Sequence, residues 1–203
     1  MQLTLIRHGE TVWNREKRVQ GLTDVELSET GIDQARRLAL SLRDFPIDVI
    51  YSSPLKRAFQ TAELINRYHR KAINVEPGLM EMDQGDFEGL TFQELLAREQ
   101  DFIRSWIADP ESVRMPGGES LAELQSRAWP PVEKLMAEGR NALIVSHNFT
   151  IATILCRLRN IRLSEFRSTC VDNASRTHIR IEEGAARIEA INDVRHLKTE
   201  TDV

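Results

Sequence analysis

The sequence predicts a single α/β domain, residues 1–203, with a mostly parallel sheet and an antiparallel pair of strands near the end of the chain. Two observations indicate this class. Short apolar segments alternate along the chain with stretches of helical periodicity, which is typical of parallel sheets. The last two apolar segments flank Glu183 and Gly184, a hairpin signal. No repeat, linker or low-complexity segment divides the 203 residues, a length that fits one domain.

The first half of the chain is expected to form three strands and two helices. Strands are predicted at residues 2–6, 48–51 and 73–75. Ser28 is the expected N-cap of the first helix, whose apolar face consists of Ile32, Ala35, Leu38, Ala39 and Leu42. Ser53 is expected to cap the second helix, with Pro54 at its first position and its end near residue 68.

The second half is expected to contain further helices and strands. Thr91 with Glu94 and Ser120 with Glu123 have the spacing of capping boxes, and each pair predicts a helix start. The helix after Ser120 is expected to kink or break near the proline pair at residues 130–131, because proline lacks the backbone N–H. The other expected elements are a buried strand, a buried helix and two late strands, at residues 142–145, 150–158, 177–182 and 187–191.

Composition and charge exclude several classes of protein. The formal net charge is −4 and Lys and Arg form no long run, which argues against nucleic-acid binding, because that affinity depends on phosphate contacts. No apolar run approaches the ~20 residues that cross a bilayer, and the start lacks the features of a signal peptide. Cys156 and Cys170 have no metal-like or redox-like spacing. We therefore expect a cytoplasmic protein with reduced thiols.

Basic side chains follow three of the predicted strands at the points where those strands end. Arg7 and His8 come directly after the first strand. Arg57 lies in the first turn of the helix after the second strand, and His147 follows the strand at residues 142–145. Ligand sites of open α/β sheets form beyond the carboxyl ends of parallel strands. Two histidines and two arginines are therefore expected to share one small pocket.

This set of side chains suits phosphoryl transfer. Guanidinium groups bind phosphate in a bidentate manner and stay charged at neutral pH, and the helix N-terminus beside Arg57 would add donors. A neutral imidazole such as that of His8 is a competent nucleophile. A protonated His147 would stabilise charge on the transferred group.

A leaving alkoxide needs a proton, and the loop after the third strand offers a donor. Glu81 is the candidate, as a carboxyl close to the phosphate oxygens. The same loop also holds Asp83, Asp86 and Glu88. An exposed cluster of carboxylates is the ordinary alternative for this loop.

The candidate residues belong to a longer series of motifs that follow one another in a fixed order. The series is Leu5-Ile6-Arg7-His8-Gly9-Glu10-Thr11, Trp13-Asn14, Gly21 with Thr23 and Asp24, Leu27-Ser28 with Gly31 and Gln34-Ala35, Ser52-Ser53-Pro54-Leu55-Lys56-Arg57-Ala58 with Gln60-Thr61-Ala62, Glu81 with Gly85 and Phe87-Glu88-Gly89, Pro116-Gly117-Gly118-Glu119-Ser120, and Val145-Ser146-His147. In these motifs the sequence resembles the histidine phosphatase superfamily, the phosphoglycerate-mutase-like proteins, over nearly its whole length.

The resemblance implies a three-layer α/β/α sandwich with no metal or organic cofactor. It implies that His8 is the phosphorylated nucleophile and that Glu81 donates and accepts the proton. The phosphoryl group would be bound by Arg7, Arg57 and His147. The remaining substrate-binding positions would be Asn14, Gly21, Thr23 and Asn148, with Thr23 acting through its backbone.

One position departs from the family pattern. Asn148 stands where the family usually has Gly. Because Asn tolerates left-handed backbone conformations better than most residues, we expect the loop to be kept. The Asn148 side chain is expected to reach the pocket and to alter how substrate fits.

Within the family, the sequence looks more like the phosphatases than the mutases. The chain is short and leaves little room between residues 88 and 116 for the extra stretch that mutases carry. The Pro-Gly-Gly-Glu-Ser loop also looks like that of the phosphatases, which include α-ribazole phosphatase and phosphoserine phosphatase. The expected partner is a small-molecule phosphoester, and the oligomeric state stays open, with a homodimer as one alternative.

Three rival functions stay open. One is a phosphoglycerate mutase of the phosphohistidine type, and another is a non-catalytic phosphate-binding module on the same fold. The third is a metal-dependent hydrolase that uses His8, Asp24, Asp83 and His147. The sequence disfavours the metal-dependent enzyme, because it contains no pair of histidines a helical turn apart.

Overall fold

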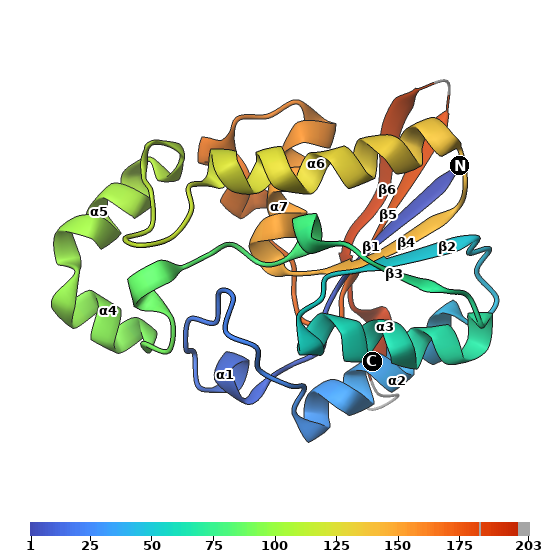
Figure 1. Ribbon diagram of the computed structural model, residues 1–203, viewed down its shortest axis with the longest axis horizontal. Helices are drawn as coiled ribbons and strands as arrows, with labels where there is room; N and C mark the ends of the chain where they lie inside the picture. The colour runs from blue at the N-terminus through green and yellow to red at the C-terminus, as the bar shows by residue number, and fades with distance from the viewer. Residues whose placement is uncertain (183, 199–203) are drawn as a thin grey trace.

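Six strands form one sheet in the computed structural model, which describes residues 1–182 and 184–198 (Figure 1). They are β1 (Gln2–Arg7), β2 (Val49–Ser52), β3 (Ile73–Val75), β4 (Ala142–Ser146), β5 (Arg176–Glu182) and β6 (Ala185–Asp193). Their order across the sheet is β3-β2-β4-β1-β5-β6. The first four strands are parallel to one another. Strand β5 runs antiparallel to both of its neighbours, β1 and β6. The predicted sheet with its antiparallel edge is confirmed, and Glu183 of the hairpin signal lies outside the described residues.

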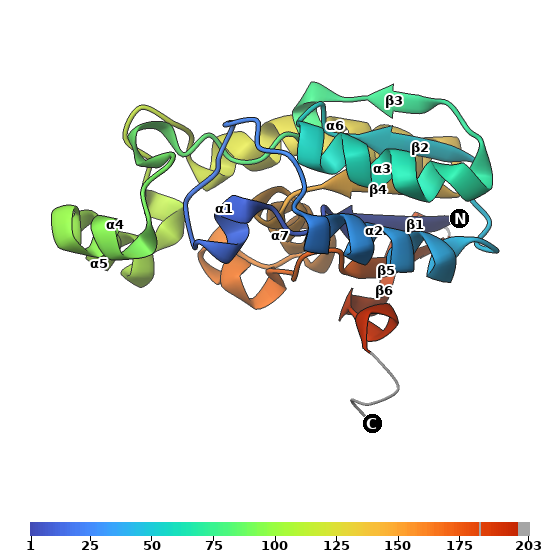
Figure 2. The same ribbon diagram turned by 90° about the horizontal axis from the view of Figure 1, so that it is seen from below.

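Helices cover both faces of this sheet. The α-helices of the described chain are α1 (Val12–Arg15), α2 (Glu29–Leu42), α3 (Lys56–His69), α4 (Phe92–Arg98), α5 (Gln100–Ala108), α6 (Leu121–Glu138) and α7 (Asn148–Arg159). Those that pack on the sheet are α2, α3, α6 and α7. In Figure 1, α2 and α3 lie below the sheet and α6 and α7 above it, and Figure 2 shows α2 and α3 in front of the strands. The three-layer α/β/α sandwich is therefore confirmed.

The central strands are buried because both faces of the sheet are covered. All five residues of β4 are buried, as expected for a parallel strand between two helix layers. Ile6 and Val145 pack with Leu38 and Ala58 on the side of α2 and α3. On the side of α6 and α7, the buried cluster contains Leu3, Leu5, Val132, Leu135, Ile144 and Ile151.

The sequence signals for helix starts hold at three of four positions. Ser28 caps α2, and its hydroxyl accepts the N–H of Gly31 at 3.1 Å. Thr91 and Ser120 form the predicted capping boxes. The prediction for Ser53 was wrong, because α3 begins only at Lys56.

The start of α3 is capped from a distant part of the chain. Pro54 and Leu55 lie in a turn before the helix, and the N–H of Lys56 donates to Oδ1 of Asp24 at 2.7 Å. The Ser53 hydroxyl accepts the N–H of Leu55, just before the helix, at 3.2 Å and lies 2.8 Å from Nε2 of His147. The carboxylate of Asp24 thus satisfies an N-terminal N–H that the sequence pattern had assigned to serine.

The proline pair does not break the helix that contains it. Helix α6 is continuous from Leu121 to Glu138 with Pro130 and Pro131 inside it. Proline removes the donors for the carbonyls of Ser126 and Arg127, four residues earlier. The carbonyl of Arg127 lies instead against Gly78, where an added Cβ would meet that oxygen at 2.5 Å. Buried residues of α6 such as Ala128, Val132 and Leu135 pack against the sheet, and this packing outweighs the tendency of proline to interrupt a helix.

The stretch between residues 88 and 116 forms α4 and α5. These two short helices project away from the sheet on the left of Figure 1. Within residues 1–182 and 184–198, every helix is too short or too polar to cross a membrane.

Candidate active site

The ends of three parallel strands bring the predicted site residues together. Arg7 at the end of β1 lies opposite Ser146 at the end of β4, and the N–H of His8 donates to the Ser146 carbonyl at 3.1 Å. The rings of His8 and His147 are both buried, and their centroids are 5.1 Å apart. Arg57, which follows β2 in the first turn of α3, is fully buried. Parallel pairing therefore places both histidines and both arginines at one edge of the sheet.

The backbone around His8 fixes the orientation of its ring. Nδ1 of His8 lies 2.7 Å from the carbonyl oxygen of Gly9, so Nδ1 carries the proton and Nε2 keeps its lone pair. The loop itself lies tightly against the start of α2. A Cβ at Gly9 would lie 2.4 Å from the Gly31 carbonyl, and one at Gly31 would lie 2.0 Å from the carbonyl of Glu10. Only glycine fits at both positions, so the loop after His8 packs directly against the start of α2.

Burial keeps both histidines neutral in the ligand-free protein. It lowers the pKa of His8 well below its usual value, and the cations of Arg57 and Arg7 lower it further. The pKa of His147 is also well below its usual value, chiefly because of burial and then because of Arg57. A neutral His8 is the form that can act as a nucleophile. The positive charge expected on His147 would then require an anion bound nearby.

These shifts predict a loss of stability in mild acid. Unfolded histidine titrates near the ordinary value of 6.5, whereas His8 and His147 stay neutral to much lower pH in the folded protein. Below about pH 6.5 the unfolded state therefore binds more protons. The free energy of unfolding should fall by up to about 1.36 kcal/mol per pH unit for each histidine.

Melting temperatures measured from pH 7.5 down to about 5 test this. The His8→Ala variant should fall less steeply, and equal slopes would contradict the assignment.

Arg57 is held by backbone carbonyls rather than by a carboxylate. Its Nη1 donates to the Thr23 carbonyl and its Nη2 to the Gly21 carbonyl, both at 2.8 Å. The predicted alternative partner, Glu63, makes no such contact among the described residues. Burial lowers the pKa of Arg57 to about 10, so the side chain remains cationic at neutral pH.

Several buried nitrogen atoms of the site lack a partner within the described chain. They are Nε of Arg7, Nε of Arg57 and Nδ1 of His147. Buried polar atoms are nearly always hydrogen-bonded in folded proteins, so these three are candidates for contact with a ligand. Because two of them belong to cationic side chains, the ligand they fit best is an anion.

Seven of the nine predicted site residues line a cavity of about 170 Å³. Its lining consists of Arg7, His8, Asn14, Arg18, Val19, Gln20, Gly21, Arg57, Glu81, Gln84, Asn148 and Phe149. A larger hollow of about 680 Å³ lies between α7 and β6, but among the described residues its only charged side chains are Arg159 and Glu189, and no nucleophile lines it. The chemistry therefore belongs to the smaller cavity.

Three predicted pocket residues take positions that the sequence did not specify. Thr23 does not line the cavity, and its carbonyl holds Arg57 instead. His147 does not line the cavity either, and its Nε2 lies on the Ser53 hydroxyl. Asn148 lines the cavity as the first residue of α7, where its backbone is helical rather than left-handed. The usual Gly is therefore not required by backbone conformation here.

Glu81 lies at the N-terminus of α7. One oxygen of its carboxylate accepts from the N–H of Met82 at 2.9 Å and of Thr150 at 3.3 Å, and the other from the N–H of Phe149 at 3.4 Å. Of the four carboxylates in this loop, all within the described chain, only Glu81 lines the cavity. This placement favours Glu81 over its neighbours as the proton donor.

Two of the other three acidic residues of the loop, Asp83 and Glu88, have structural partners. Asp83 accepts the N–H of Gly85 at 2.9 Å. Glu88 accepts the N–H groups of Leu22 and Thr23 at 2.7 and 2.9 Å. Across the described residues, no group of three or more His, Cys, Asp or Glu side chains is arranged to hold a metal ion.

A sequence model of the histidine phosphatase superfamily, branch 1, matches residues 3–194. The chain belongs to the histidine phosphatase superfamily. It is 37% identical over 199 residues to phosphoserine phosphatase 1 of Hydrogenobacter thermophilus, covering 97% of this chain and 94% of that protein. It is also 31% identical over 204 residues to a probable phosphoglycerate mutase of Yersinia pestis, covering 97% and 95%.

The fold agrees with solved structures of related proteins. One is a histidine-to-alanine mutant of phosphoserine phosphatase from Entamoeba histolytica in complex with phosphoserine. It matches with a TM-score of 0.85 and 29% identity, covering 97% of this chain and 99% of that chain. The family expected from the sequence motifs is therefore confirmed.

For this histidine phosphatase, sequence reasoning missed the residues that support the site. Arg18, Val19, Gln20, Gln84 and Phe149 line the cavity without having been predicted. Glu88 was placed in a motif, but its role in holding the loop at residues 21–23 under Arg57 was not foreseen. The sequence signal that was available is the glycine at position 21. In the structure a side chain has no room there, because a Cβ at Gly21 would meet Oε1 of Glu88 at 1.9 Å.

Proposed function

We propose that this protein hydrolyses small-molecule phosphomonoesters through a phosphohistidine intermediate on His8. The observation that carries the proposal is the position of His8, whose neutral imidazole lies in a cavity with Arg7 and Arg57. Its Nδ1 is occupied by the Gly9 carbonyl, so the lone pair on Nε2 is available for attack. The two guanidinium groups would hold the phosphoryl oxygens.

In the first step, Nε2 of His8 forms a bond to phosphorus while the bond from phosphorus to the ester oxygen breaks. The electron pair of that bond leaves on the oxygen, which takes a proton from the carboxyl group of Glu81. Arg7 and Arg57 stabilise the charge on the three remaining phosphoryl oxygens. The products of this step are an alcohol and a phosphorylated His8.

In the second step, water attacks phosphorus and transfers a proton to the Glu81 carboxylate. The bond between nitrogen and phosphorus breaks, and its electron pair returns to Nε2 of His8. Inorganic phosphate leaves, and the protonated Glu81 is ready for the next ester. No metal is needed, because the two arginines supply the positive charge.

The outer part of the cavity favours a substrate that carries a second anionic group. The side-chain oxygen of Asn14 accepts from Thr11 N and Asn173 Nδ2, both at 3.1 Å. The oxygen of Gln20 accepts from the Thr11 hydroxyl at 2.8 Å. Because both amide oxygens already accept hydrogen bonds and both residues line the cavity, their NH2 groups are the donors left for a ligand. Arg18 also lines the cavity, with its Nε on Glu16 and its Nη1 on the Gly89 carbonyl. A phosphorylated carboxylic acid such as phosphoserine fits these donors, and two of the similar proteins are phosphoserine phosphatases.

Replacing Glu81 with Gln should slow esters with poor leaving groups far more than those with good ones. Gln cannot donate the proton that a serine alkoxide needs, so kcat/KM for phosphoserine should fall about 10²-fold. The leaving group of p-nitrophenyl phosphate hardly needs that proton, so its kcat/KM should change by less than about threefold. The two esters are compared by kcat/KM, because this constant reports only the steps up to formation of the phosphoenzyme, whereas the second step uses Glu81 for every ester. Asp86→Asn, in the same loop but off the cavity, is the matched control. Equal losses on both esters would mean that Glu81 is not the acid.

The direct test is phosphate release from a panel of esters with EDTA present throughout. The panel contains phosphoserine, 3-phosphoglycerate, α-ribazole phosphate, sugar phosphates and p-nitrophenyl phosphate. We expect turnover without metal, fastest with a phosphorylated carboxylic acid. If vanadate binds but no ester releases phosphate, the phosphatase proposal fails in favour of a mutase or a binding module. Loss of activity in EDTA that is restored by metal would favour the metal-dependent rival.

A further inference from the structure

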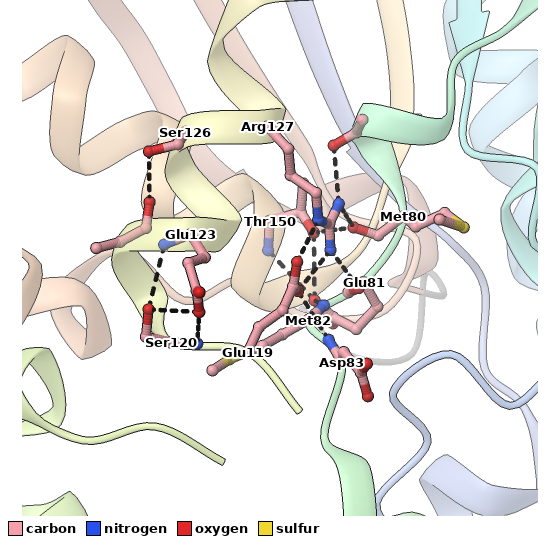
Figure 3. Close-up of polar contacts among 12 residues, drawn as sticks. Met80, Glu81, Met82, Asp83, Glu119, Ser120, Glu123, Ser126, Arg127 and Thr150 are labelled. Carbon is pink, nitrogen blue, oxygen red and sulfur yellow. Dashed lines mark hydrogen bonds and ion pairs between the residues drawn. The ribbon is translucent and has the colours of Figure 1, made fainter. Parts of the chain in front are cut away.

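Arg127 on α6 is bonded to the backbone of the segment that carries Glu81. Its Nη1 donates to the carbonyls of Gly78 and Met80 at 2.9 and 2.8 Å, and its Nη2 donates to the carbonyl of Glu81 at 2.6 Å (Figure 3). Its two remaining N–H bonds go to the carboxylate of Glu119, from Nε at 2.7 Å and from Nη2 at 2.9 Å. All five donors of this guanidinium are therefore used on one loop and its support.

Glu119 completes the contact on the other side of Glu81. One of its oxygens accepts the N–H of Asp83 at 2.9 Å, and its own N–H donates to the Asp83 carbonyl at 2.9 Å. The turn before it passes very close, because a Cβ at Gly118 would lie 2.3 Å from the Asp83 carbonyl. Arg127 and Glu119 thus hold the chain both before and after Glu81.

This arrangement determines where the Glu81 carboxyl group can lie. The side chain bonds to the N–H groups of Met82 and Thr150 and reaches the cavity from there. The hydroxyl of Thr150 adds a bond to the Met80 carbonyl at 2.7 Å. A general acid must lie within hydrogen-bond reach of the oxygen that it protonates, and a misplacement of about 1 Å costs on the order of 10²-fold in rate.

The Arg127–Glu119 pair is shielded enough for its geometry to be maintained. The two side chains are 24% and 18% exposed, and two of the guanidinium's nitrogens bond to the carboxylate. Paired bonds of this kind are stronger and more directional than a single surface ion pair. By contrast, Arg114, which precedes the same helix, and Glu123 in its first turn form a pair that is 60% and 48% exposed.

We propose that Arg127 and Glu119 are positioning residues that hold Glu81 where it can protonate the leaving group. The inference rests on the proposed role of Glu81 as general acid and adds two residues that touch neither the phosphoryl group nor His8. Their contribution to rate passes through Glu81 alone. It should therefore depend on the leaving group in the same way as that of Glu81.

The test compares two esters in the full-length protein. In Arg127→Met and in Glu119→Gln, kcat/KM for phosphoserine should fall about 10²-fold, whereas kcat/KM for p-nitrophenyl phosphate, which reports only the steps up to formation of the phosphoenzyme, should change by less than about threefold. Vanadate affinity should stay unchanged, because Arg7 and Arg57 are intact. Arg114→Met, which breaks an exposed pair beside the same helix, is the control and should alter neither ester. Equal losses on both esters, in variants that fold by circular dichroism, would overturn the proposal.

A double-mutant cycle separates this inference from the proposed role of Glu81. If Arg127 acts through Glu81, then adding Arg127→Met to Glu81→Gln should lower kcat/KM for phosphoserine by no more than about threefold further. A full additional loss of about 10²-fold would overturn the inference while leaving Glu81 as the acid. If Glu81→Gln itself fails to discriminate between the esters, the proposed function is at fault instead. Should Arg127→Met fail to fold, the same cycle with Glu119→Gln decides the question.

Discussion

His8→Ala should lower turnover of every phosphoester by roughly 10⁴-fold or more, while vanadate or phosphate still binds. The variant removes the atom that would form the bond to phosphorus, so the covalent route is closed. The groups expected to hold the anion, Arg7 and Arg57, are not altered. Their backbone partners lie at Gly21, Thr23 and Val171, none of which depends on the imidazole.

The measurements are steady-state turnover, vanadate binding and trapping of the phosphoenzyme. Wild-type protein mixed with substrate and quenched in alkali should carry phosphate on histidine, and His8→Ala should carry none. His178→Ala is the control, because His178 lies outside the cavity on β5 and contacts Thr4 at 3.2 Å. Near-normal turnover by His8→Ala would reject the central mechanism. Loss of vanadate binding together with turnover would instead assign His8 to the fold of the loop.

The sequence predicted the layout of the site because that layout follows from local patterns and one rule of topology. Apolar runs located β1, β2 and β4, and parallel pairing then required that Arg7, Arg57 and His147 meet at the same edge. The capping residues Ser28 and Ser120 were also predictable, because their partners lie three residues away in the chain. Local signals and tertiary structure agree at these positions.

The predictions failed where the deciding contact joins distant parts of the chain. Ser53 is a good capping residue by type, but Asp24 caps α3 from 32 residues away. The prolines of α6 were expected to kink or break the helix, and the break does not occur, because α6 runs continuously through Pro130 and Pro131 with buried residues packed against the sheet. Neither outcome can be derived from the residues next to Ser53 or to the prolines.

The supporting residues of the site were missed for the same reason. Arg127 reaches the carbonyl of Glu81 across 46 residues, and Glu88 reaches the N–H of Leu22 across 66. Both are charged residues on partly exposed segments, where a charge is most often solvated. The glycines indicate these close contacts better than the charged residues do. The carboxylate of Glu88 leaves no room for a side chain at Gly21, and the carbonyl of Asp83 leaves none at Gly118.

Arg57→Met should lower kcat/KM by about 10³-fold, and unlike His8→Ala it should also abolish anion binding. Arg57 is fully buried, and its Nη1 and Nη2 are fixed by the carbonyls of Thr23 and Gly21. Its Nε has no partner in the described chain. A buried cation held in this way is preorganised for the charge of a transferring phosphoryl group, and removing one such donor typically costs 10²–10³-fold. Removing the whole charge should lie at the upper end of that range.

Thermal stability in vanadate provides the readout for binding. At a vanadate concentration of about 100 times Kd, wild-type protein should gain about 2.7 kcal/mol of unfolding free energy, and His8→Ala should gain a similar amount. Arg57→Met should gain almost none. Arg67→Met, an exposed arginine later in the same helix, is the matched control and should behave as wild type.

Removing Arg57 also changes the titration of its neighbours. The cation of Arg57 is the second cause, after burial, of the lowered pKa of His8 and of His147. In Arg57→Met both pKa values should rise towards 6.5, so the acid limb of the pH–rate profile should move to higher pH. If Arg57→Met keeps vanadate stabilisation and an unchanged pH profile, the anion site does not lie between Arg57 and His8. If His8→Ala loses turnover but keeps vanadate binding, whereas Arg57→Met loses both, then the nucleophile and the anion-binding cation are distinct groups, as the mechanism requires.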